Sequence, residues 1–115
     1  MAEASWSVLL VDSDDGFVDD AKGLLNEHTV HTARNMSDGQ RRLVEEGIQI
    51  AILGPTFGSS ESVRDVRMLF ELRPALPVIL ATDELTTDVL RTAMRLGVKD
   101  VIETPLSSSK LGESL

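Results

Sequence analysis

The residues of this sequence that could best support chemistry are five aspartates between positions 12 and 20. They are Asp12, Asp14, Asp15, Asp19 and Asp20. The cluster directly follows the apolar run Ser7–Val11, which is typical of a strand buried on both faces. Mg²⁺ accepts one or two carboxylates together with water, so Asp12 and Asp14 are candidate ligands of a weak Mg²⁺ site. Capping of the next helix by Asp14 or Asp15 is the competing explanation.

The apolar pattern of the whole chain predicts five strands that alternate with helices. We expect the strands at 7–11, 29–33, 48–53, 77–81 and 98–102. Strict alternation with short connections is typical of parallel strands joined by right-handed crossovers. The sequence therefore predicts an α/β fold, a flavodoxin-like doubly wound sheet of five parallel strands in the order 2-1-3-4-5. The working crevice of such a sheet lies at the carboxyl ends of its strands, here residues 12–15, 54–58, 82–84 and 103–105.

Turn residues predict where the second and fourth helices begin and end. Ser37 and Gln40 have the spacing of a capping box. Thr86 or Thr87 is expected to start the fourth helix, and Gly97 is expected to end it. The apolar stripe expected on this helix is Leu85, Val89, Ala93 and Leu96.

The third and fifth helices are bounded by other signals. Residues 58–60 are expected to open a third helix that continues to just before Pro74. Helices of roughly ten to fourteen residues are typical, so the few residues after Leu106 predict a truncated last helix. A single core saturates at roughly 250–300 residues, so residues 1–115 are one domain, expected to be the N-terminal part of a longer protein.

Three stretches of this chain resemble a response-regulator receiver domain. The segment Val8–Asp14 looks like that family's first strand and acidic cluster, and Ala93–Ile102 is similar to its fourth helix and fifth strand. Thr104-Pro105-Leu106 stands where the family has Lys-Pro-Phe or Lys-Pro-Leu. The resemblance implies the CheY-like fold and a role in signal transduction of the two-component type.

The residues of the family's chemistry do not carry over. Phosphoryl transfer in the family needs an aspartate at the end of the third strand, where this chain has Gly54, and a lysine where it has Thr104. The family's acidic pair aligns with Asp12 and Ser13, so half of it is absent or displaced to Asp14. The family's switch hydroxyl is retained by Thr82, at the end of the fourth predicted strand. These departures imply a pseudo-receiver that is not phosphorylated, is not an enzyme and needs no cofactor beyond weakly bound Mg²⁺.

A rival enzyme class also fits the acidic segment. The segment from Asp12 to Gly16 is close to the Asp-x-Asp motif of haloacid-dehalogenase phosphatases, with Asp12 as nucleophile and Asp14 as general acid beside a divalent metal. That family also needs a lysine and a second acidic group late in the fold. Lys99 and the pair Asp83–Glu84 are the candidates, but no motif surrounds them, and a short Asp-x-Asp match arises easily by chance.

Composition excludes several other functions. Eleven basic and nineteen acidic residues give a formal charge of −8, which would repel nucleic acids and anionic membranes. The absence of cysteine excludes disulfides and thiolate chemistry. No apolar run approaches the ~18–20 residues needed to span a bilayer, and the segment Met1–Ser5 lacks the features of a signal peptide. We therefore expect a cytoplasmic protein.

Apolar residues outside the buried stripes predict a surface for a protein partner or a second copy of the chain. The face formed by the fourth helix, the fifth strand and the fifth helix commonly mediates dimerisation in receiver-like folds. Its expected residues are Leu90, Arg91, Met94, Arg95 and Leu111. We predict self-association through this face, with the two arginines on its rim.

The last part of the sequence bears on the attached output domain. The segment from Gly97 to Ser107 is similar to pilus-assembly localisation proteins of the Tad/Cpa type, which carry an atypical receiver before a ParA/MinD-like ATPase domain. A response regulator with a DNA-binding output is the alternative. Sequence beyond Leu115 would discriminate them, by a deviant Walker motif or a helix-turn-helix.

Overall fold

The computed structural model describes residues 5–115 and contains one five-stranded sheet. The strands are β1 (Ser7–Val11), β2 (Thr29–Ala33), β3 (Ile50–Leu53), β4 (Val78–Thr82) and β5 (Asp100–Glu103). The α-helices are α1 (Asp15–Leu24), α2 (Met36–Glu45), α3 (Arg67–Leu72), α4 (Thr87–Leu96) and α5 (Ser108–Ser114), and the short 3₁₀ helices are η1 (Pro55–Phe57) and η2 (Ser62–Val66). All strand pairs are parallel and the order is β2-β1-β3-β4-β5. This confirms the predicted flavodoxin-like α/β fold.

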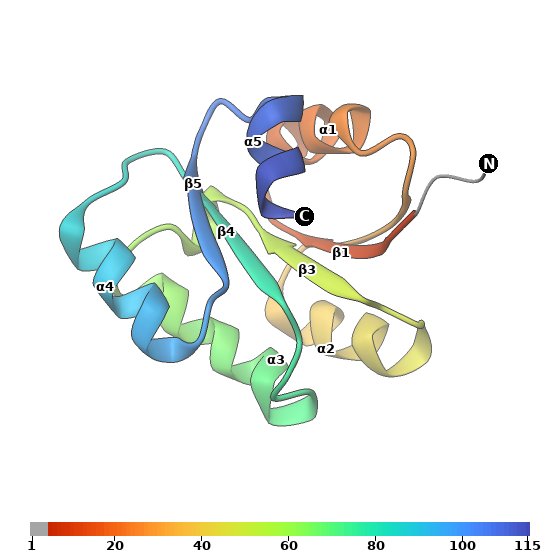
Figure 1. The fold of residues 1–115 in the computed structure, drawn as a ribbon. Coiled ribbons are helices and arrows are strands. Elements are labelled where there is room, and N and C mark those ends of the chain that lie inside the picture. The colour runs from red at the N-terminus through yellow and green to blue at the C-terminus, as the bar shows by residue number, and fades with distance from the viewer. Residues whose placement is uncertain (1–4) are drawn as a thin grey trace.

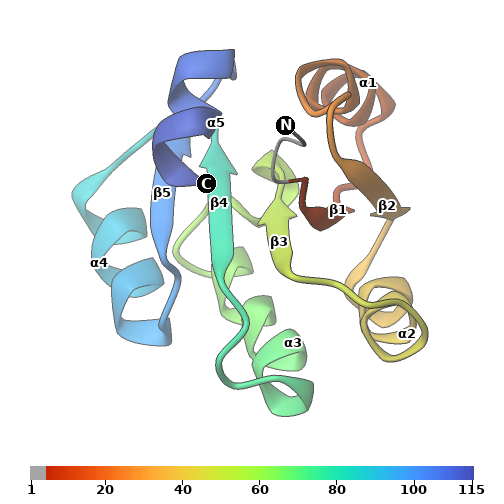
Figure 2. The same cartoon turned by 45° about the vertical axis from the view of Figure 1, so that its right-hand side comes forward.

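Helices cover both faces of the sheet, with α1 and α5 on one face and α2, α3 and α4 on the other (Figures 1 and 2). Alternate residues of β1 serve the two layers. Leu9 and Val11 pack under α2, α3 and α4, whereas Val8 and Leu10 pack under α1 and α5. Because every residue of β3 and β4 is buried, both strands read as continuous apolar runs. The more polar β2 lies at an edge of the sheet, as its composition predicted.

Three of the expected helix ends are confirmed. The Asp14 carboxylate caps α1 and accepts a hydrogen bond from the N–H of Gly16 at 2.9 Å. Thr86 caps α4 through its hydroxyl, which accepts from the N–H of Val89 at 3.1 Å. Gly97 ends α4 with a φ of 102°, a conformation that favours glycine.

The predicted capping box at Ser37 is wrong. Asn35 is the N-cap of α2, and its side-chain oxygen accepts from the N–H of Asp38 at 2.8 Å. Ser37 therefore lies inside the helix. Gln40 donates instead to the main-chain oxygen of Met68 at 2.9 Å, a contact with α3 that no local pattern announces.

The continuous third helix expected from residues 58–60 is also wrong. The segment forms η1 and η2 before α3 begins at Arg67, and α3 has six residues. Ser59 and Ser62 bond each other through main chain and side chain, the Ser62 N–H to the Ser59 hydroxyl at 2.9 Å and the Ser59 N–H to the Ser62 hydroxyl at 3.0 Å. This reciprocal pair offers the backbone an alternative to the first α-helical turn.

Two leucines do not lie where they were predicted. Leu85 precedes the Thr86 cap and is 41% exposed, so it is not part of the apolar stripe of α4. Leu111, predicted to lie at an interface, is 2% exposed and packs in the core under α1 and α5. The far end of α5 is held by a hydrogen bond from the Ser114 hydroxyl to Asp100 at 2.5 Å. Leu111 is therefore a core residue, because α5 turns its apolar side to the sheet.

The structure bears little on cellular location. Residues 1–4, most of the stretch used for the cytoplasmic expectation, lie outside the described residues. Within residues 5–115, no helix is long and apolar enough to cross a membrane. The cytoplasmic location stays a prediction.

Candidate functional site

The sheet brings the predicted pocket residues together at the carboxyl ends of its strands. They are Asp12, Ser13 and Asp14 after β1, Gly54 after β3, Thr82 at the end of β4 and Thr104 after β5. The Gly54 N–H donates to the Val11 carbonyl at 2.9 Å, which makes Gly54 a neighbour of Asp12. The Thr104 N–H donates to the Thr82 carbonyl at 2.8 Å. Parallel pairing therefore assembles the pocket, as expected from the carboxyl ends of the strands.

Asp12 is the buried centre of this pocket, with a residue exposure of 1%. Its Oδ1 accepts a hydrogen bond from the Thr56 hydroxyl and another from the Asp14 N–H at 3.2 Å. The Ser13 hydroxyl lies 3.1 Å from that of Thr56. Among the described residues, Asp12 Oδ2 has no hydrogen-bond partner. The carboxylate is thus held on one side by hydroxyl and amide donors and packed against protein on the other.

Gly54 provides the space that the Asp12 carboxylate occupies. A Cβ added at Gly54 would lie 1.9 Å from Asp12 Oδ2 and 2.6 Å from its Cγ, far closer than real contacts. The backbone of Gly54 has a φ of −85°, which any residue adopts, so glycine stands here for space and not for conformation. The carboxylate that follows β1 therefore fills the volume into which a side chain at the end of β3 would project.

A second glycine has the same relation to the Thr82 hydroxyl. A Cβ at Gly58 would lie 2.7 Å from Thr82 Oγ1. That hydroxyl donates to the Gly58 carbonyl, with an oxygen–oxygen distance of 2.9 Å, and its oxygen lies 3.1 Å from the Glu84 carbonyl. It also accepts from the Glu84 N–H at 3.3 Å. Thr82 is 1% exposed, and its hydroxyl is engaged by the loops after β3 and β4.

The pocket receives no ammonium group from the loop after β5. Thr104 donates its hydroxyl to Asp83 at 2.6 Å, and the Thr104–Pro105 peptide bond is cis. The nearby Lys110 of α5 turns its Nζ to the carbonyls of Glu103 and Pro105, at 2.8 and 3.1 Å. Both contacts tie α5 to the loop, so this lysine is engaged outside the pocket.

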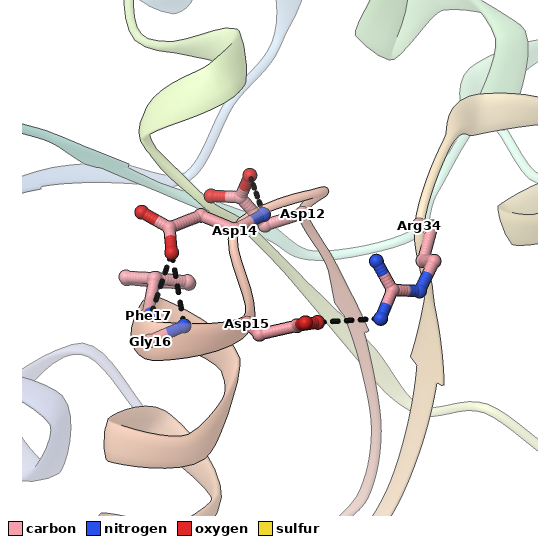
Figure 3. A network of polar contacts seen from close by, with 6 residues as sticks. All are labelled: Asp12, Asp14, Asp15, Gly16, Phe17 and Arg34. Carbon is pink, nitrogen blue, oxygen red and sulfur yellow. Dashed lines mark hydrogen bonds and ion pairs between the residues drawn. The ribbon is translucent and has the colours of Figure 1, made fainter.

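Asp14 and Asp15 are engaged in local structure. In Figure 3 the Asp14 carboxylate turns to the start of α1, and Asp15 forms an ion pair with Arg34 of the loop after β2 at 2.5 Å. Within residues 5–115, no group of three or more His, Cys, Asp or Glu side chains is arranged to hold a metal ion. Capping therefore explains Asp14, and Asp12 with Asp14 would supply only two carboxylates to Mg²⁺.

Nothing in this geometry supports the phosphatase alternative. Its nucleophile would be Asp12, whose carboxylate is enclosed, and its general acid would be Asp14, whose carboxylate caps α1. Lys99, the candidate cation, precedes β5 at the amino ends of the strands, and it donates to the Ser114 carbonyl at 2.6 Å. Lys99 therefore lies away from the two aspartates.

Sequence reasoning missed Thr56. It lies in η1, is exposed, and donates to Asp12 across 44 positions of the chain. The only signal was its place three residues after the end of the predicted strand 48–53, within the segment 54–58. That place shows proximity to the crevice but not the hydrogen bond to Asp12.

The predicted interface residues on α4 are exposed. Leu90 and Met94 are 38% and 45% exposed, and Arg91 and Arg95 are exposed beside them. Leu111 is buried on the other side of the sheet and does not join them. The accessible part of the predicted interface is therefore the outer surface of α4.

Strand order and helix layers together define the CheY-like receiver fold. A response regulator from Thermotoga maritima superposes with a TM-score of 0.83 at 20% identity, covering 96% of this chain and 98% of that one. A CheY-like receiver domain protein from Methanospirillum hungatei JF-1 gives 0.80 at 20% identity, with 96% and 90% covered.

A third similar structure is described as a putative pilus assembly-related protein from Burkholderia pseudomallei K96243. It gives a TM-score of 0.80 at 20% identity and covers 99% of this chain and 92% of its own. No protein-family model matches this chain, and no curated protein matches it. The likeness is therefore one of fold.

Proposed function

We propose that this domain is a non-phosphorylatable receiver-like signalling module that acts by protein contact to regulate or localise an attached output domain. The observation that carries the proposal is the contact between Asp12 and Gly54, in which a carboxylate occupies the space of a phospho-acceptor side chain. The CheY-like fold supports a signalling role. The enclosed carboxylate and the engaged lysine argue against catalysis.

Incubation with acetyl phosphate and Mg²⁺, followed by intact-mass analysis, tests the proposal. We expect no phosphoryl adduct on this chain, whereas a typical receiver domain treated in parallel acquires one. Gly54→Asp alone should not restore the adduct, because the new carboxylate would collide with Asp12 and position 104 would still lack a lysine. A metal-dependent adduct on any aspartate of the unmodified chain would disprove the proposal. Mapping of that adduct to Asp12, with turnover of p-nitrophenyl phosphate, would favour the phosphatase instead.

The surface of α4 is the proposed site of self-association. Leu90 and Met94 are exposed apolar residues one turn apart, with Arg91 and Arg95 beside them. Leu90→Asp with Met94→Asp should weaken self-association in sedimentation experiments on the full-length protein. Val44→Asp, which changes a 72% exposed apolar residue on α2, is the matched control and should leave it unchanged. Equal association of both variants would place the interface elsewhere.

The attached domain is proposed to be a ParA/MinD-like ATPase of the pilus-localisation type. The similarity of residues 97–107 to Tad/Cpa proteins and the fold likeness to a pilus assembly-related protein support this choice. A DNA-binding output is the alternative, since the receiver fold alone serves both. A deviant Walker motif in the sequence after Leu115 would support the ATPase, and a helix-turn-helix would contradict it.

A further inference from the structure

Met94 is the one exposed methionine among residues 5–115. Its exposure is 45%, whereas Met36 is 5% exposed within the core and Met68 is half-buried against the core under α2, α3 and α4. Met1 lies outside the described residues, and the sequence contains no cysteine. On the described surface of this domain, sulfur chemistry therefore falls on the thioether of Met94.

The position of Met94 makes this thioether part of the surface proposed for self-association. The helix α4 lies beside β5, on the face of the sheet opposite α1 and α5 (Figures 1 and 2). Leu90 lies one turn before Met94 and is 38% exposed, so the two apolar side chains are neighbours on one side of the helix. A methionine side chain is unbranched and flexible, which lets it adapt to an opposing surface. Association through this side of α4 would remove the sulfur from water.

The fold does not depend on the side chain of Met94. Its carbonyl accepts a hydrogen bond from the Gly97 N–H at 3.2 Å, and this contact uses only the main chain. The buried side of α4 is formed by Val89 and Ala93, with Leu96 packed against the same core. A change in the polarity of the Met94 side chain therefore leaves the packing of α4 intact and alters only what its surface can bind.

We propose that hydrogen peroxide oxidises Met94 to the sulfoxide and that this oxidation weakens self-association through α4. The sulfur lone pair attacks one oxygen of the peroxide, so that a sulfur–oxygen bond forms and the oxygen–oxygen bond breaks. The departing hydroxide takes the proton of the transferred oxygen and leaves as water. Sulfur thus loses two electrons and the peroxide gains them. The product is a polar side chain in place of an apolar one.

The new oxygen opposes association because it is a hydrogen-bond acceptor that water satisfies in the free chain. An interface that covers it removes this water, and a polar group buried without a partner is unfavourable. The thioether carries no such cost, and its burial favours association. Conversely, association covers the sulfur, so the rate of oxidation should fall as the associated fraction rises. This inference rests on the proposed self-association and adds its regulation.

Peroxide treatment of the full-length protein at a range of protein concentrations, followed by peptide mapping in a mass spectrometer, tests the first step. Where the protein is dissociated, the sulfoxide should form faster at Met94 than at Met68 or Met36, because the thioether of Met94 is the accessible one. Where the protein is associated, Met94 should react more slowly. The rates at Met68 and Met36 are the internal control and should not depend on protein concentration.

Sedimentation before and after peroxide treatment tests the second step. The dissociation constant of the oxidised protein should be roughly tenfold higher, as expected for one polar group buried without a partner. Treatment with a methionine sulfoxide reductase should restore the lower value. Met94→Leu removes the thioether, so the dissociation constant of this variant should be the same before and after peroxide. Met68→Leu is the matched control and should respond to peroxide as the unmodified protein does.

Several results would overturn the inference. They are oxidation at Met94 no faster than at Met68 in the dissociated protein, a rate at Met94 that is the same in the associated protein, and an equal response of Met94→Leu and the unmodified protein to peroxide. Absence of self-association before any treatment would disprove the proposed association and this regulation with it. An unchanged dissociation constant after complete oxidation of Met94 would disprove the regulation alone.

Discussion

The enclosed pocket around Asp12 lies at the carboxyl ends of the strands, and an open groove lies beside it, between α1 and the loop that joins β5 to α5. The two are built in opposite ways. In the pocket, Asp12 and Thr82 occupy the space left by Gly54 and Gly58, and their polar atoms bond to neighbouring loops. In the groove, Asp14, Asp20 and Asp83 are exposed, although Asp14 also caps α1 and Asp83 accepts from Thr104. The apolar side chains of the groove are half-buried. The comparison teaches that this chain fills the volume that a side chain after β3 would occupy and leaves an open groove next to it. The pocket should therefore govern stability, and the groove should not.

Gly54→Ala should produce the largest loss of stability. The new Cβ would collide with the Asp12 carboxylate, which is 1% exposed and cannot leave without losing its bonds to Thr56 and Asp14. We expect the free energy of unfolding to fall by about 3 kcal/mol, as measured by urea denaturation followed by circular dichroism.

A double variant and a control define the cause of that loss. Asp12→Ala in the Gly54→Ala background should recover much of the stability, since it removes the colliding carboxylate. Gly23→Ala in α1, where nothing lies within 4 Å of the added Cβ, should be neutral or stabilise the protein by up to about 1 kcal/mol. Additive effects of the changes at positions 12 and 54 would contradict the packing argument.

Gly58→Ala should have the next largest effect. Its Cβ would lie 2.7 Å from Thr82 Oγ1 and 3.1 Å from the Pro55 carbonyl. We expect a loss of about 2 kcal/mol in the free energy of unfolding. Thr82→Ala should relieve part of this loss in the double variant. A Gly58→Ala protein as stable as the parent would show that Thr82 is not held as described.

Thr56→Val should have a smaller effect. The change keeps the shape of the side chain and removes the hydroxyl that donates to Asp12. A lost hydrogen bond to a buried carboxylate lowers stability by about 1–2 kcal/mol. Ser13→Ala is the control, because the Ser13 hydroxyl contacts the Thr56 hydroxyl and not the Asp12 carboxylate. A loss as large for Ser13→Ala as for Thr56→Val would mean that the hydroxyl network acts as a unit.

Asp20→Asn with Asp83→Asn should have the smallest effect. Both residues are exposed, and within residues 5–115 neither lies in an ion pair. The new amide oxygen at position 83 can still accept the hydrogen bond that the Thr104 hydroxyl donates to Asp83. The unfolding midpoint should stay the same or rise slightly. The change makes the net charge of −8 less negative and so reduces the repulsion between like charges. A marked drop in the midpoint would show that the groove is part of the stabilising structure and would remove the contrast with the pocket.

Local patterns predicted the parts of the fold that depend on local physics. The strands appeared as apolar runs because β1, β3 and β4 are buried on both faces. Gly97 was predictable because a helix end with positive φ favours glycine, and Thr86 because a hydroxyl can cap orphan amides. Strict alternation and crossover handedness predicted a doubly wound parallel sheet, and the order 2-1-3-4-5 was chosen within that class as the flavodoxin-like one.

Several failures came from contacts between distant parts of the chain, whereas the Asn35 cap and the Ser59–Ser62 pair are local contacts that the sequence analysis missed. Gln40, the expected partner of Ser37, bonds to α3 instead of to the start of its own helix. Leu111 looked free in the sequence but packs against the sheet. Thr56 and Asp12 meet only because β1 and β3 are adjacent. The absence of an aspartate at position 54 was readable, but the carboxylate that takes its place was not.

The contact between Asp12 and Gly54 also constrains the evolution of this chain. A substitution at position 54 introduces a collision before it introduces any new activity. Proteins are typically stable by only about 5–15 kcal/mol, so a variant with a side chain at position 54 loses a large part of its free energy of unfolding. A side chain at position 54 therefore needs a change at Asp12 that makes room for it. Two changes, of which the first gives no gain by itself, separate this sequence from one with a side chain at position 54.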